Sequence, residues 1–126
     1  MGRLNGKTAL VVGAAGKDNM AQVIARRLTA EGARVAVAGR KADALSAFAH
    51  EIGGVAVACD MTDQQSIKTA VSDTEAALGG VDIAINATGW GLLKPFLETT
   101  QDDLDAMVER MVDFVGAGFT GLVRVA

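Results

Sequence analysis

A turn near the amino terminus, GAAGKDNMA at residues 13–21, has the residue types that an anion-binding loop needs. An apolar run typical of a strand precedes it, and a segment with helical periodicity follows it. A helix that begins directly after a strand presents unpaired backbone N–H groups and a partial positive charge. The small residues Gly13, Ala15 and Gly16 would allow a phosphate group to approach this backbone closely.

The glycine spacing leaves a second interpretation open. The dinucleotide fingerprint places three glycines in the order Gly-x-Gly-x-x-Gly, whereas here only Gly13 and Gly16 precede Lys17 and Asn19. A plain strand-to-helix turn also uses glycine for tightness. The turn alone therefore does not separate a binding loop from a structural one.

Polar or small residues also follow the other three predicted strands. They are Gly39-Arg40-Lys41, Asp60, and the NATG segment at 86–89. Taken separately, the cations could be solvated, Asp60 could cap a helix and Asn86 could shape a turn. Because the carboxyl ends of parallel strands form the ligand crevice of an open α/β sheet, their shared position favours a binding site.

The elements that would position these residues alternate along the chain as in βαβ units. The predicted strands are TALVV (8–12), RVAVA (34–38), VAVAC (55–59) and VDIAIN (81–86). Their apolar residues are consecutive, which is typical of strands covered by helices on both faces. We expect one domain over residues 1–126 with an α/β fold, a Rossmann-type doubly wound parallel sheet of about four strands with flanking helices.

Four helices are predicted around these strands. The first ends before Gly32, the second stops at Gly53, the third opens at a capping box beginning at Thr62 and closes at Gly79, and the fourth begins near Thr100. The apolar positions expected to face the core are Met20, Ile24, Leu28, Leu45, Phe48, Ala49, Ile52, Ile67, Val71 and Leu78, and on the fourth helix Leu104, Met107, Val108, Met111 and Val115.

Composition excludes several classes of function. The formal net charge is −3 with acidic and basic residues interleaved, so no basic face for a nucleic acid is expected. Cys59 and His50 are the only residues of their types, which precludes an internal disulfide and a closed zinc site. No run approaches the ~20 apolar residues of a membrane span, and the opening MGRLNGKTAL has no signal-peptide core. We expect a cytoplasmic protein without nucleic-acid or membrane partners.

Several stretches in order give a resemblance to a known family. The glycine turn, GARVAVAGRKADAL, CDMTD, GGVDIAINATG and KPFLETTQDDLDAM resemble the short-chain dehydrogenase/reductases over essentially the whole chain. The resemblance implies a nicotinamide dinucleotide across the strand ends and hydride transfer between a carbonyl and an alcohol. The residues implied to contact the cofactor are Gly13, Ala15, Gly16, Lys17, Asn19 and Met20 in the turn, Gly39, Arg40 and Lys41 after the second strand, Asp60 and Met61 at the adenine, and Asn86, Ala87 and Gly89 beneath the ribose.

The residues after the second strand predict the type of cofactor. Members that use NAD carry a carboxylate at the tip of this strand for the ribose hydroxyls, whereas this chain has Gly39 followed by Arg40 and Lys41. Cations suit a 2′-phosphate, and Lys17 could add a third charge. We predict NADP(H), with NAD(H) as the alternative.

Two departures from the family pattern bear on activity. The turn Gly13-x5-Asn19-x-Ala21 is nearer to the Gly-x5-Ser-x-Ala turn of enoyl-acyl-carrier-protein reductases, so the subfamily stays open. The family's reaction uses a serine and a Tyr-x-x-x-Lys pair, but this sequence has no tyrosine, and its serines fall on the second and third predicted helices. Asp113 is a weak candidate for a family asparagine.

The chain therefore reads as the cofactor-binding half of such an enzyme, truncated before its catalytic segment and inactive alone. The carbonyl or alcohol substrate would bind to the complete enzyme. The fourth strand would form an open edge, so we expect a homo-oligomer or association through this edge.

Two other functions remain as alternatives. One is a non-catalytic nucleotide-binding module or pseudoenzyme that acts by association, which the lack of tyrosine favours. The other is a phosphoacceptor receiver domain, for which Asp60 and Thr88 are suitably placed. The receiver interpretation is weak because the first strand, ending in VVGAAG, lacks the acidic pair that would hold Mg²⁺.

Overall fold

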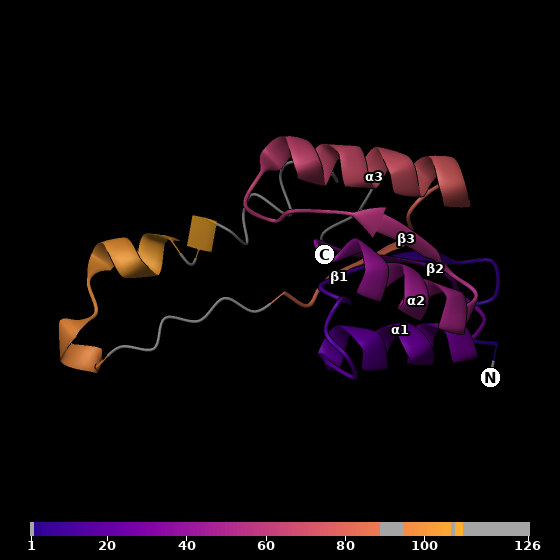
Figure 1. Cartoon of the computed structure of the whole chain (residues 1–126), viewed down its shortest axis with the longest axis horizontal. Coiled ribbons are helices and arrows are strands. Elements are labelled where there is room, and N and C mark those ends of the chain that lie inside the picture. The colour runs from indigo at the N-terminus through magenta and orange to yellow at the C-terminus, as the bar shows by residue number, and fades with distance from the viewer. Residues whose placement is uncertain (1, 89–94, 107, 110–126) are drawn as a thin grey trace.

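The protein forms a parallel α/β sheet in the computed structural model, which describes residues 2–88, 95–106, 108 and 109 (Figure 1). The elements are β1 (Thr8–Val12), α1 (Met20–Ala30), β2 (Arg34–Gly39), α2 (Ala42–Ile52), β3 (Val55–Ala58), α3 (Gln64–Leu78), β4 (Ile83–Asn86) and the 3₁₀ turn η1 (Phe96–Glu98). The strand order is β3-β2-β1-β4, and every pairing is parallel. The predicted fold class is confirmed, although β3 ends one residue earlier and β4 begins two residues later than expected.

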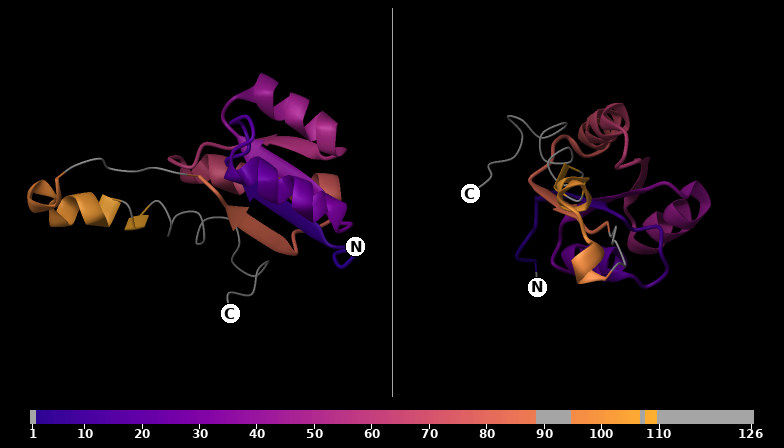
Figure 2. Two further views of the ribbon diagram at one scale, coloured as in Figure 1. Left: turned by 90° about the horizontal axis from the view of Figure 1, so that it is seen from below. Right: turned by 90° about the vertical axis from the view of Figure 1, so that its left-hand side faces the viewer.

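Helices cover both faces of the sheet, α3 on one and α1 with α2 on the other (Figures 1 and 2). Strand β1 shows why its apolar run is continuous. Leu10 and Val12 pack on the α3 side, while Ala9 and Val11 pack on the side of α1 and α2. Each successive side chain meets a helix layer, so a half-polar strand would not fit here.

The predicted glycine stops are confirmed at all three helix ends. Gly32, Gly53 and Gly79 have φ values of 97°, 67° and 84°, a conformation that glycine adopts without steric cost. The predicted start of α3 is wrong by one residue. Thr62 bonds instead to Asp60, and Asp63 is the cap, because its carboxylate accepts the Gln65 N–H at 3.0 Å.

Three apolar residues that the sequence predicts to be buried are exposed. Met20 is 72% exposed because it begins α1 at the end of the helix nearest the turn. Residues 101–106 are helical and start at a reciprocal Thr100–Asp103 cap as predicted, but Leu104 and Val108 are 49% and 58% exposed. Figures 1 and 2 show this helix standing clear of the sheet, so no described surface covers it. The Met107 side chain, Met111 and Val115 lie outside the described residues.

Strand β4 is an edge of the sheet within the described residues, where it pairs only with β1. Its approach to β1 is fixed by Asp82, whose Oδ2 accepts the Thr8 N–H at 2.9 Å and the Thr8 hydroxyl at 3.2 Å. The Asp82 N–H donates back to Thr8 Oγ1 at 3.1 Å. This clamp sets the register that brings Asn86 beside Val12. No helix in the described ranges is long and apolar enough to cross a membrane.

Candidate functional site at the strand ends

The register of the sheet brings the predicted site residues to one edge. Val12 pairs with Ala38 and with Asn86, and Gly39 pairs with Ala58. The segments that follow the four strands therefore leave the sheet at the same level. These segments carry the described part of the predicted set, whereas Gly89 and Asp113 lie outside the described residues.

The β1–α1 turn is wedged between the ends of β2 and β4. Gly13 has φ 105°, and a Cβ there would lie 2.9 Å from the Ala87 carbonyl oxygen. A Cβ on Gly39 would lie 3.3 Å from the Ala15 Cβ. Larger side chains would push these segments apart, so glycine at both positions keeps the strand ends close.

Asn19 shapes the turn with both ends of its side chain. Its Nδ2 donates to the Gly13 carbonyl at 2.7 Å, and its Oδ1 accepts the Gln22 N–H at 3.0 Å. Asn19 is therefore the N-cap of α1. An amide nitrogen has two N–H groups, so one donor remains after the bond to Gly13.

Gln22 is a residue that sequence reasoning missed. It is only 4% exposed, its Nε2 donates to the Ala14 carbonyl at 2.8 Å, and its Oε1 accepts the Asp18 N–H at 2.9 Å. The one available signal was its position three residues before the buried Ala25, on the helix face turned to the sheet.

The remaining backbone donors of the turn are available to a ligand. The N–H groups of Gly13 and Ala14 both donate to the Ala38 carbonyl, and that of Asn19 donates to Gly16. Within the described part of the chain, the N–H groups of residues 15–17 have no acceptor. Three successive unpaired donors before a helix N-terminus are suited to an anion.

Positive charge lies beside this turn. Arg40 and Lys41 are exposed and directly follow β2, and Lys17 is exposed in the turn itself. Lys41 is the N-cap of α2, and its side chain makes no capping hydrogen bond to that helix. The first-turn N–H groups of α2 thus add a second place where an anion would be stabilised.

Asp60 is placed at the end of β3 and is held as a carboxylate. Its Oδ1 accepts the Thr62 N–H at 2.9 Å and the Thr62 hydroxyl at 2.7 Å, and these bonds lower the pKa of Asp60. The positive charge of Arg40 lowers the pKa further. The Asp60 N–H donates to Ser66 Oγ at 2.8 Å, so Ser66 has a structural contact here.

The residues after β4 form a compact turn. The Ala87 N–H donates to the Val12 carbonyl at 3.0 Å, which continues the β1–β4 ladder. Asn86 is exposed, and its Oδ1 accepts hydrogen bonds from the N–H and hydroxyl of Thr88. Met61, the partner of Asp60 in the prediction, is half-buried against the α3-side core.

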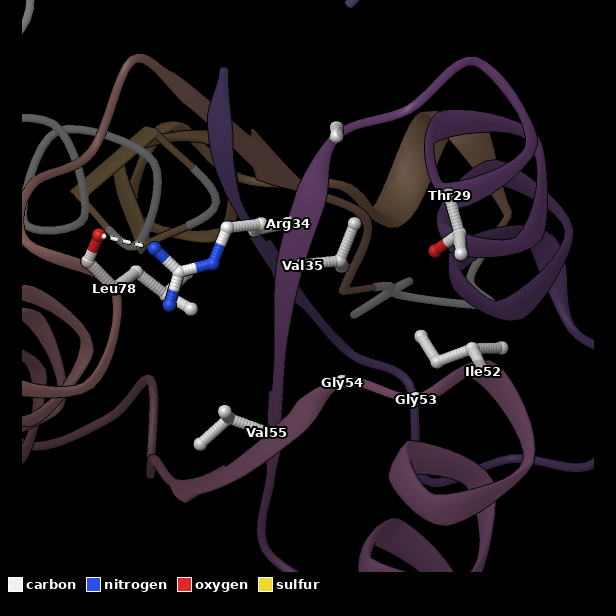
Figure 3. A pocket seen from close by; sticks show the side chains of 9 residues that line it. Thr29, Arg34, Val35, Ile52, Gly53, Gly54, Val55 and Leu78 are labelled. Atoms are coloured by element: carbon white, nitrogen blue, oxygen red, sulfur yellow. Dashed lines mark hydrogen bonds between the residues drawn. The ribbon is translucent and has the colours of Figure 1, made fainter. Parts of the chain in front are cut away.

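A small cavity of about 160 Å³ lies near the amino ends of β2 and β3, away from the strand ends that carry the predicted site (Figure 3). It is lined by the first residues of β2 and β3 and by the last residues of the helices, and the Arg34 guanidinium beside it donates to the Leu78 carbonyl at 3.1 Å. The cavity is separate from the strand-end residues. Among the described residues, no group of three or more His, Cys, Asp or Glu side chains could hold a metal ion.

Comparison with known proteins agrees with this arrangement. A family model described as Enoyl-(Acyl carrier protein) reductase matches residues 13–120. The chain is 38% identical over 107 residues to a sorbitol dehydrogenase of Cereibacter sphaeroides, and 35% identical over 109 residues to a D-threitol dehydrogenase of Mycolicibacterium smegmatis. These alignments cover 83% and 82% of this chain but 41% of each relative.

A solved structure of a short-chain dehydrogenase from Mycobacterium smegmatis superposes with a TM-score of 0.81 at 26% identity, over 93% of this chain and 52% of that one. The chain thus spans about two fifths of the length of the curated relatives and about half of the structural one. The family match, the parallel sheet and the glycine turn agree, and the chain belongs to the short-chain dehydrogenase/reductase family.

Proposed function

We propose that the protein is an NADP(H)-dependent short-chain oxidoreductase and that these 126 residues form its cofactor-binding half. Membership of the family implies a nicotinamide dinucleotide. The observation that carries the proposal is the set of N–H groups at residues 15–17, which have no acceptor among the described residues and lie where all four strands end. When bound, the cofactor supplies the hydride donor or acceptor.

The pyrophosphate would lie on the β1–α1 turn. The donors of Ala15, Gly16 and Lys17 would bond its oxygens, and the positive end of α1 would stabilise its charge. The second N–H of Asn19 Nδ2 adds a donor in the same turn. Asp60 with Met61 would contact the adenine, and Asn86, Ala87 and Gly89 would lie under the ribose.

The 2′-phosphate of NADP(H) would meet the cations after β2. Gly39 offers no carboxylate to repel it, and the Arg40 guanidinium can bind a phosphate through two hydrogen bonds. The uncapped N-terminus of α2 and the charges of Lys41 and Lys17 support the same preference. NAD(H) is the alternative cofactor.

The substrate would be an alcohol or the corresponding carbonyl compound. The bound cofactor would supply the hydride acceptor for alcohol oxidation, and the reaction would also need a group that takes the hydroxyl proton. The sequence contains no tyrosine. We therefore assign the proton transfer to groups outside these 126 residues. The names of the two polyol dehydrogenases make sugar alcohols the first substrates to assay.

Isothermal titration of the full-length protein with NADPH and NADH tests the cofactor proposal. We expect NADPH to bind more tightly, and Arg40→Ala to weaken NADPH binding by about tenfold while leaving NADH unchanged, because the lost contact is to the extra phosphate. Lys68→Ala removes an exposed cation on α3 and is the matched control. If neither dinucleotide binds at millimolar concentration, the proposal is wrong.

The absence of tyrosine also favours a second candidate, a nucleotide-binding module that acts by association. A protein of this kind would bind NADPH and would not oxidise it with any carbonyl substrate in a broad panel. Association through the β4 edge is a further proposal, which sedimentation equilibrium tests directly. The receiver alternative loses its support because the family is that of the oxidoreductases.

A further inference from the structure

We propose that Gln22 is a positioning residue that holds the β1–α1 turn in the conformation needed for an anionic ligand. The inference rests on the proposed function, because the ligand in question is the cofactor's pyrophosphate. Gln22 does not reach the ligand itself. Its side chain acts on the backbone that carries the ligand's hydrogen-bond donors.

One buried side chain closes the turn at both ends. Nε2 of Gln22 donates to the Ala14 carbonyl at 2.8 Å, and its Oε1 accepts the Asp18 N–H at 2.9 Å. Between these two attachment points lie the N–H groups of residues 15–17, which have no acceptor in the described part of the chain. Gln22 thus hydrogen-bonds the Ala14 carbonyl and the Asp18 N–H on either side of these three donors and leaves the donors themselves to a ligand.

Asp18 shows why the turn needs such a clamp. It has φ 52°, a left-handed conformation that residues other than glycine rarely adopt. The Gln22 bond holds its N–H, and its carboxylate pairs with Arg26 at 3.0 Å. Arg26 also bonds Glu51 of α2 at 3.0 Å, so the far end of the turn is tied to both neighbouring helices.

A turn that is ordered before binding loses less conformational freedom when the ligand arrives. Removing the Gln22 amide therefore acts on ligands that use the pyrophosphate contacts. It acts much less on a ligand that binds through its adenine and 2′-phosphate, because Arg40 and Lys41 follow β2 and only Lys17 lies in the turn. This difference separates positioning from a general loss of stability.

The test compares ADP, which carries a pyrophosphate, with 2′-AMP, which does not, on the full-length protein. Gln22→Leu keeps the side-chain size and removes both hydrogen bonds. We expect it to weaken ADP and NADPH by about tenfold and to weaken 2′-AMP by less than twofold. Thr74→Val is the matched control, because Thr74 is also fully buried in a helix and donates to the Ala70 carbonyl, but on the opposite face of the sheet.

Equal losses for ADP and 2′-AMP, or no loss for either, would overturn the positioning role. Should Gln22→Leu not fold, Gln22→Glu retains an acceptor for the Asp18 N–H and loses the donor to Ala14, and we expect it to weaken ADP selectively as well. If the wild-type protein binds none of the nucleotides, the proposed function fails.

Amide hydrogen exchange then tests the inference without a ligand. We expect exchange of the Asp18 amide to be faster in Gln22→Leu than in the wild-type protein by about tenfold or more, with no change at the Leu45 amide in α2. An unchanged Asp18 rate contradicts the clamp.

Discussion

Replacing Gly13 with alanine should destabilise the protein by more than its backbone conformation alone explains. Gly13 has φ 105°, and a left-handed alanine costs about 1–2 kcal/mol. The new Cβ would also lie 2.9 Å from the Ala87 oxygen and 3.0 Å from its carbonyl carbon, both backbone atoms. Forcing atoms into a packed region costs about 1–3 kcal/mol. We expect a total loss of about 2–5 kcal/mol in the free energy of unfolding.

The matched control is Gly53→Ala. Gly53 has φ 67°, and a Cβ there would meet no atom within 4 Å, so only the conformational cost of about 1–2 kcal/mol applies. Urea unfolding followed by circular dichroism gives the free energy of unfolding of both variants. If the two unfolding curves have the same dependence on urea concentration, the difference between their midpoints reports the difference in stability. Equal losses for the two variants would refute the close approach of the β1 end to the β4 end.

Three further predictions concern the rest of the domain. Hydrogen bonds from the Thr8 N–H and hydroxyl, with the charge of Lys7, lower the pKa of Asp82 in the folded protein. The Asp82 carboxylate therefore stabilises the fold fully above its unfolded pKa of about 3.9, and this stabilisation is lost as the pH falls through its lower folded pKa. Urea midpoints measured from pH 6 to pH 2.5 should therefore fall less steeply in Asp82→Asn, and identical profiles would contradict the clamp. Burial raises the pKa of the Cys59 thiol, so a thiol reagent at pH 8 should label the native protein far more slowly than the urea-unfolded one, and equal rates would contradict its burial. Leu45→Ala should cost about 2–5 kcal/mol in the unfolding free energy, and a loss below that range would show that Leu45 is not in the core.

Much of the fold was predictable because its signals are local. Continuous apolar strands, helical periodicity and glycine stops each depend on a few neighbouring residues, and the positive φ values of Gly32, Gly53 and Gly79 confirm the predicted stops. The position of the candidate site was also predictable, because neighbouring parallel strands place their carboxyl ends at the same side of the sheet.

The wrong predictions concern a helix cap and a buried helix face, and both depend on contacts that residue spacing does not reveal. Thr62 has the sequence of a helix cap, but the carboxylate of Asp60 takes both its N–H and its hydroxyl, which leaves the cap to Asp63. Leu104 and Val108 have the spacing of a buried face, yet burial requires a second surface.

Gln22 illustrates the same limit at the candidate site. A glutamine in a helix usually faces water, and only the three-dimensional position of the Ala14 carbonyl and the Asp18 N–H shows what its amide does. For Asn19 the structure adds two contacts within the turn that the sequence did not predict. Its Oδ1 caps α1 and its Nδ2 donates to the Gly13 carbonyl.

An amide chemical-shift titration of the ¹⁵N-labelled protein with NADPH tests the cofactor site most directly. We expect the largest changes at Ala15, Gly16 and Lys17, followed by Arg40 and Lys41, and no change at the residues that line the cavity near the amino ends of β2 and β3. Changes concentrated at that cavity, or none in the β1–α1 turn at saturating NADPH, would contradict the assignment of this turn as the phosphate-binding site.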